Sequence, residues 1–107
     1  MNSLSDRRAI LLRMEDARRQ TQHQLDLIDR QIVRRMTAVI PQLHPRRSPY
    51  RHGKPPDSAA FLARYRANLA AITAERQQEI DALSRKLARQ DRAIEALRER
   101  PAGRRPS

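Results

Sequence analysis

The chain has 107 residues with no cysteine and no tryptophan, and 23 basic against 12 acidic residues give a formal net charge of +11. This length allows one domain at most, and the lack of cysteine excludes disulfides and thiolate metal sites. No apolar run approaches the roughly 20 residues of a membrane-spanning helix, so we expect a soluble, cytoplasmic protein with no membrane partner.

Residues 1–40 are predicted to form the first helix. Ser3 and Asp6 have the spacing of a capping box, in which each side chain satisfies a backbone donor at the helix start. Pro41 disfavours helical backbone in the residue before it, so the helix should end at Ile40. Pairs of an acid four residues before an arginine support the helical assignment here and further along the chain. These pairs are Glu15 with Arg19, Asp26 with Arg30, and Asp81 with Arg85.

Residues 41–57 form a basic connection rich in proline, PQLHPRRSPYRHGKPPD. Links of this length without regular structure are uncommon in compact domains and are usually functional or disordered. Basic residues surround Tyr50, and such an arrangement can hold phosphate while the ring stacks on a base. Contact with an acidic protein surface and a solvated loop are the alternatives. His44, His52 and Asp57 are too widely spaced in such a loop to preorganise a metal site.

Residues 58–100 are predicted to form the second helix, and residues 101–107 a basic, disordered tail. Positions along this helix follow the alternation of three and four residues that is typical of a coiled-coil seam. One step breaks the alternation at Arg76, where two four-residue spacings meet and locally unwind a supercoil.

The apolar stripes of the two helices mirror each other when the chain is folded back. Position 14 then meets 87, and 32 meets 69, in one antiparallel register. This register sets Arg18 opposite Leu83 and Arg76 opposite Leu25. Both arginines are expected to lay their stems on the seam, or else to fix the register or meet acids of another chain. The stripe residues are Leu4, Met14, Thr21, Leu25, Ile32, Met36, Val39, Leu62, Tyr65, Leu69, Ile80, Leu83, Leu87 and Leu97.

The predicted fold is therefore all-α, a long antiparallel two-helix coiled-coil hairpin. Two helices around one seam bury little apolar area for a chain of this length. Leu27, Val33 and Ile40 do not all fit on the narrow seam, which favours dimerisation into a four-helix arrangement or a helical protein partner.

No nucleophile, acid-base pair, phosphate-binding loop or metal motif stands at a recognisable spacing, so we expect no enzyme, no cofactor, no metal and no small-molecule substrate. The predicted function is that of a basic coiled-coil adaptor that binds a polyanion, above all nucleic acid, through its loop and tail. The residues expected to make this contact are Arg46, Arg47, Tyr50, Arg51, Lys54, Arg104 and Arg105. The alternative is a coiled-coil module that docks only on proteins, within a larger assembly of the secretion, phage or motor type.

Overall fold

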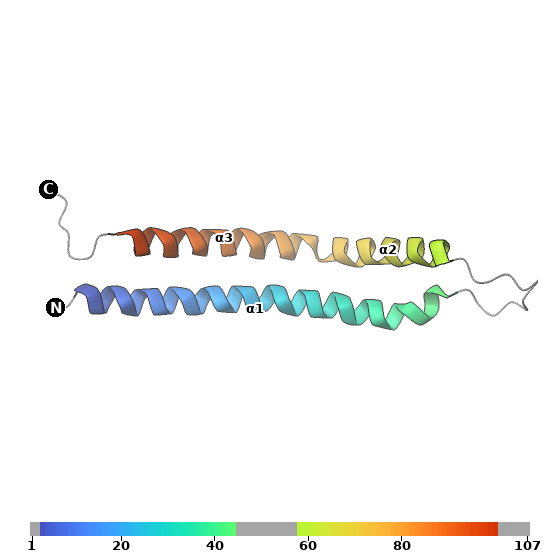
Figure 1. Cartoon of the computed structure of the whole chain (residues 1–107), viewed down its shortest axis with the longest axis horizontal. Coiled ribbons are helices and arrows are strands. Elements are labelled where there is room, and N and C mark those ends of the chain that lie inside the picture. Colours follow the sequence, from blue (N-terminus) through green and yellow to red (C-terminus); the bar gives the residue numbers. More distant parts are fainter. Residues whose placement is uncertain (1–2, 45–57, 101–107) are drawn as a thin grey trace, which may run out of the picture. The chain divides into compact units, whose positions relative to one another are not determined.

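The computed structural model describes residues 3–44 and 58–100. They form three helices, α1 (Ser3–Leu43), α2 (Ser58–Glu75) and α3 (Gln77–Glu99), and these two stretches contain no strand (Figure 1). The predicted all-α class is thus confirmed for them. The chain divides into two compact units. We call residues 1–27 with 79–107 the terminal unit, and residues 28–78 the loop-bearing unit.

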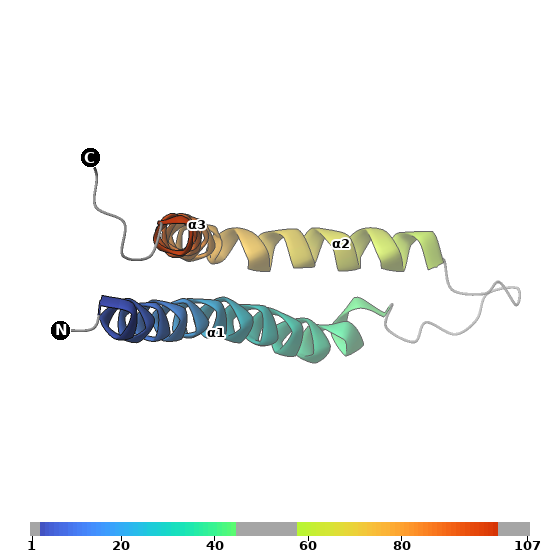
Figure 2. The ribbon, with the colours of Figure 1, turned by 60° about the vertical axis from the view of Figure 1, so that its left-hand side comes forward.

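The terminal unit pairs the first part of α1 with α3 (Figure 2). Three contacts between side chains of α1 and α3, or the residue after α3, show how the two helices run. They join Arg7 to the carbonyl of Arg100, Glu15 to Arg98, and Arg18 to Asp91. As the residue numbers of these contacts rise along α1, those of their partners fall along the second helix, so the two helices are antiparallel. Ile94 and Thr21 are its buried residues, and the Thr21 hydroxyl donates to the carbonyl of Ala17 at 3.2 Å.

The loop-bearing unit pairs the last part of α1 with α2. Its contacts also run antiparallel, and they join Gln31 to Arg76, Arg35 to Glu75, and Leu43 to Arg64. Five apolar side chains on its seam are no more than 7% exposed. These are Ile28, Ile32, Met36 and Leu43 of α1 and Ile72 of α2.

The predicted seam is largely the observed one. Most stripe residues are buried or half-buried, but Leu4 is 54% exposed and Leu62 is 43% exposed, so the prediction was wrong for these two. Leu4 lies one turn before Arg7, which already contacts the residue that follows α3, so no helix covers it. On α2, half-buried Phe61 takes the seam position four residues before Tyr65 in place of Leu62.

The first helix does not end at Ile40. It continues through Pro41 to Leu43, and the ribbon bends in this last turn (Figure 1). Proline costs most in a helix interior, where it removes a hydrogen bond and clashes with the preceding turn. Here the turn is held from outside, because Leu43 is buried and its carbonyl accepts a hydrogen bond from Arg64 Nε at 2.9 Å.

The predicted second helix is interrupted at Arg76, which separates α2 from α3. The Arg76 N–H donates to the carbonyl of Thr73 at 3.0 Å, three residues back, which tightens the turn relative to an α-helix. This is the position at which two four-residue spacings meet in the sequence. The break thus coincides with the irregular step of the apolar stripe.

Candidate nucleic-acid interface

Positive charge is concentrated in the loop-bearing unit. Its 51 residues carry ten basic and three acidic side chains, a net charge of +7. The terminal unit carries 13 basic and nine acidic side chains, a net charge of +4. Between Asp29 and Glu75 the sequence contains one acid, Asp57. The loop-bearing unit is thus the part of the chain with the fewest acids to offset its arginines.

Three acids of the terminal unit, Glu15, Asp16 and Asp91, pair with arginines of the same unit. Glu15 accepts a hydrogen bond from Arg98 at 2.9 Å, and Asp16 accepts one from Arg19 at 3.2 Å. The predicted pair of Glu15 with Arg19 was therefore wrong, because Glu15 reaches across to α3 and Arg19 turns to the acid three residues before it. Arg18 pairs with Asp91, and this hydrogen bond and the opposite charge raise the pKa of Arg18.

Two described arginines of the loop-bearing unit donate hydrogen bonds to neutral groups. Arg64 donates to a backbone carbonyl, and Arg76 Nη1 donates to Gln31 Oε1 at 2.7 Å. Arg35 instead pairs with an acid, since its Nη1 lies 2.5 Å from Glu75 Oε2. Hydrogen bonds to neutral acceptors orient a guanidinium but leave its positive charge intact. The electrostatic potential around this unit is therefore expected to be positive, as its net charge is, and a positive potential attracts polyanions.

The ion pair of Arg35 with Glu75 makes stability depend on pH. The hydrogen bond from Arg35, and then its charge, lower the pKa of Glu75 in the folded chain. The ion pair therefore stabilises the folded chain at pH values above the pKa that Glu75 has in the unfolded chain. This stabilisation is lost as the pH falls through the lower pKa that Glu75 has in the folded chain. We expect Glu75→Gln to lower the melting temperature slightly at pH 7 and not at pH 2, in thermal unfolding followed by circular dichroism. Glu95→Gln, at an exposed site on α3, is the control, and a Glu75→Gln deficit that persisted in acid would contradict the assignment.

Three ring side chains gather at the end of this unit where the helices meet the loop. The imidazole of His44 stacks on Phe61, with ring centroids 4.7 Å apart and planes 16° apart. Phe61 in turn lies 6.4 Å from Tyr65, with the rings tilted by 32°. Phe61 and Tyr65 are half-buried, whereas His44 is exposed. The cluster is therefore anchored on α2 and reaches solvent through the residue that follows α1.

Sequence reasoning missed this cluster as a unit. It assigned His44 to a solvated loop and Tyr65 to the seam, and it did not use Phe61. One signal was present, because Tyr50, Phe61 and Tyr65, the chain's three Phe and Tyr residues, all fall within 16 positions of the loop-bearing unit. The convergence of Phe61 and Tyr65 with His44 depends on α1 continuing past Pro41, which the proline rule did not predict.

The predicted polyanion contacts lie outside the described residues. This holds for Arg46, Arg47, Tyr50, Arg51, Lys54, Arg104 and Arg105. The residues expected at a partner interface are all described, and they are divided between the two units. Leu27 belongs to the terminal unit and is 38% exposed. Val33 and Ile40 belong to the loop-bearing unit, where Val33 is 57% exposed and Ile40 is half-buried.

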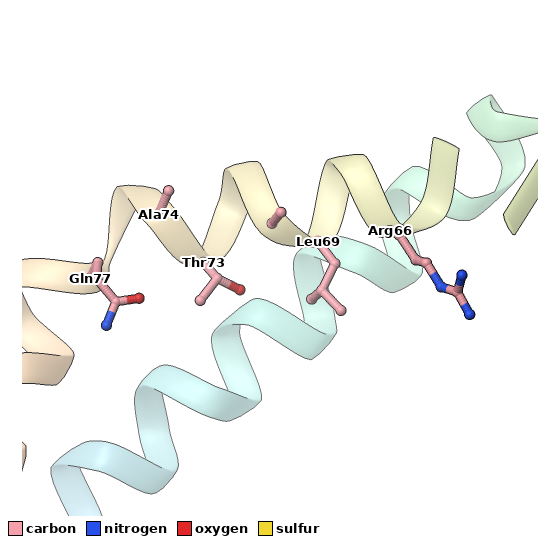
Figure 3. A pocket seen from close by; sticks show the side chains of 6 residues that line it. Arg66, Leu69, Thr73, Ala74 and Gln77 are labelled. Atoms are coloured by element: carbon pink, nitrogen blue, oxygen red, sulfur yellow. The ribbon is translucent and has the colours of Figure 1, made fainter. Parts of the chain in front are cut away.

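A shallow hollow of about 450 Å³ runs along α2 to the first residue of α3. Figure 3 shows Arg66 at one end, Gln77 at the other, and Leu69 and Thr73 between them. Alanines 70 and 74 complete the lining, so a run of small side chains leaves the backbone of this face accessible. A helix presented to such a face can approach closely.

Searches against protein-family models, curated proteins and solved structures found no match to this chain. The described helices include none that is both long and apolar enough to cross a membrane. Within residues 3–44 and 58–100, no group of three or more metal-ligating side chains lies together. The function must therefore be argued from charge, exposure and ring geometry.

Proposed function

We propose that this protein is a non-enzymatic helical adaptor that binds a polyanion, nucleic acid above all, through its basic loop and C-terminal tail. The observation that carries the proposal is the net charge of +7 on the 51 residues of the loop-bearing unit. Arginine and lysine neutralise phosphates and release the counterions condensed on them, which supplies affinity without sequence recognition.

The helices of this unit support the proposal by holding the base of the loop. Arg64 of α2 donates a hydrogen bond to the carbonyl of Leu43, the last residue of α1, and the Leu43 side chain is buried. A cation also suits the C-terminal end of α1, where the helix dipole is negative, and the last turn of α1 has no basic residue of its own. The end of α1 and the first turns of α2, which flank the loop, are thus joined to each other.

Binding through phosphates should fall steeply with salt. We expect the protein to bind a labelled oligonucleotide, in a fluorescence-anisotropy titration, about 100-fold more weakly or worse at 200 mM than at 50 mM salt if roughly four or more phosphates are contacted. Affinity that changed little over this range would contradict the proposal. Absence of binding at 50 mM salt would contradict it as well.

A second candidate is a module that docks on proteins, and it is favoured by the apolar side chains left exposed. Leu12 and Val33 are 61% and 57% exposed, and the alanine-lined hollow of α2 is open. A second copy of the chain or a partner helix would cover such faces and complete a bundle. Substituting Leu27, Val33 and Ile40 with polar residues should then abolish partner capture and leave oligonucleotide binding unchanged.

A further inference from the structure

The His44, Phe61 and Tyr65 cluster has a feature that seam packing does not require. Leu43 already closes the apolar seam at this end, being only 7% exposed. His44 adds no burial, because it stays exposed while one face of its ring is covered by Phe61 at 4.7 Å. An exposed ring held in a fixed orientation by a second ring is a platform on which another planar group can stack.

The surroundings select which planar group this is. The cluster lies in the unit with ten basic and three acidic residues. It adjoins the basic loop in sequence, because His44 comes just before the loop and α2 begins just after the loop. A ligand that combines negative charge with flat aromatic rings is an oligonucleotide. Proteins that bind single strands use this combination, a basic surface along the backbone and aromatic side chains under the bases.

We infer that His44, Phe61 and Tyr65 form a stacking platform for one or two bases of single-stranded nucleic acid. The inference rests on the proposed function, to which it adds the class of polyanion. Base faces in a duplex are already stacked on each other, and exposing one costs a few kcal/mol. Single strands present their bases freely, so the platform gives a preference for them over duplexes of the same length.

The test compares three polyanions and two histidine variants. The probes are a labelled oligothymidylate, a duplex of equal length, and inorganic polyphosphate, which carries charge without bases. His44→Ala removes the exposed ring, and His23→Ala removes an exposed histidine of the terminal unit as a matched control. Circular dichroism checks that both variants are as helical as the wild type.

Removing one stacked ring typically weakens single-strand binding by roughly fivefold or more. We therefore expect His44→Ala to raise the Kd for oligothymidylate by at least that factor, with no change for polyphosphate and none in His23→Ala. If the two histidine variants bind oligothymidylate equally, or if the wild type binds polyphosphate and duplex as tightly as the single strand, the platform is refuted. The proposed function would survive that result, because it fails only if the wild type binds no polyanion or binds without salt dependence.

A spectroscopic readout tests the platform without removing a ring from it. The chain has two tyrosines and no tryptophan, so in Tyr50→Phe the tyrosine emission comes from Tyr65 alone. Stacked bases should quench this emission on addition of oligothymidylate, and polyphosphate should not. If both probes quench the Tyr65 emission equally, or if saturating oligothymidylate does not quench it, the bases do not stack on this platform.

Discussion

Replacing Met36 by alanine is expected to cost about 2–5 kcal/mol of unfolding free energy, as removal of a buried methionine side chain usually does. Met36 is 3% exposed and lies on the seam of the loop-bearing unit, one turn after Ile32 on α1. A total stability of only about 5–15 kcal/mol is usual for a domain, and the described part of this chain has few buried residues to supply it. The melting temperature should therefore fall by about 8 °C or more, measured by circular dichroism at 222 nm.

Val33→Ala is the matched control for this loss. Val33 lies three residues earlier on the same helix but is 57% exposed, and surface substitutions usually change stability by less than about 0.5 kcal/mol. Similar melting temperatures for the two variants would show that Met36 is not buried on a seam in solution, and would contradict the pairing of α1 with α2.

The second large effect is expected on binding. Replacing Arg46, Arg47 and Arg51 by alanine should weaken oligonucleotide binding on the order of a hundredfold at 100 mM salt, because each lost phosphate contact forgoes the release of nearly one counterion. The measurement is an anisotropy titration at that salt. A control variant removes the same three charges from α3 of the terminal unit, at Arg85, Lys86 and Arg89.

The control decides whether location or net charge matters. Both triple variants have a formal net charge of +8 in place of +11, so long-range attraction is reduced equally. We expect the α3 variant to lose only a fewfold in affinity. Equal losses in the two variants would mean that the whole basic chain, and not its loop, attracts the polyanion.

Helix positions and the apolar seam could be predicted from the sequence because periodicity and charge are local. The seam positions on α3 follow from counting residues. Counting also marks Arg76 as an irregular step, but the sequence predicted one unbroken helix over 58–100, and the structure divides it there. The end of α1 could not be predicted in this way. Pro41 is a strong local signal, yet the contact of Leu43 with Arg64, 21 residues away, overrides it.

The register of the two helices shows a second limit of pattern reasoning. Arg18 contacts Asp91, eight positions beyond the predicted Leu83, and Arg76 contacts Gln31, six positions beyond Leu25. Part of this displacement arises because side chains lean towards the N-terminus of their own helix, so long side chains in an antiparallel pair meet away from the level of their backbones.

The apolar stripe alone does not fix the register. A shift of seven residues, one heptad, brings apolar positions back against apolar positions. Charges separate the two alternatives, because the predicted register sets Arg35 level with Arg66, whereas the observed one pairs Arg35 with Glu75 at 2.5 Å. The ring cluster could not be predicted from local pattern either, because the stacking of His44 on Phe61 depends on where α1 ends and on the register of the two helices.

We expect the loop of this helical protein, and not its overall charge, to bind the polyanion. This is tested by the slope of log affinity against log salt for the wild type and the two triple variants on the same oligonucleotide. Each lost phosphate contact should reduce the slope by about 0.7 to 0.9, so we expect a reduction of about two to three in Arg46/Arg47/Arg51→Ala and none in the α3 variant. An unchanged slope in the loop variant, or an equal reduction in both, would contradict it.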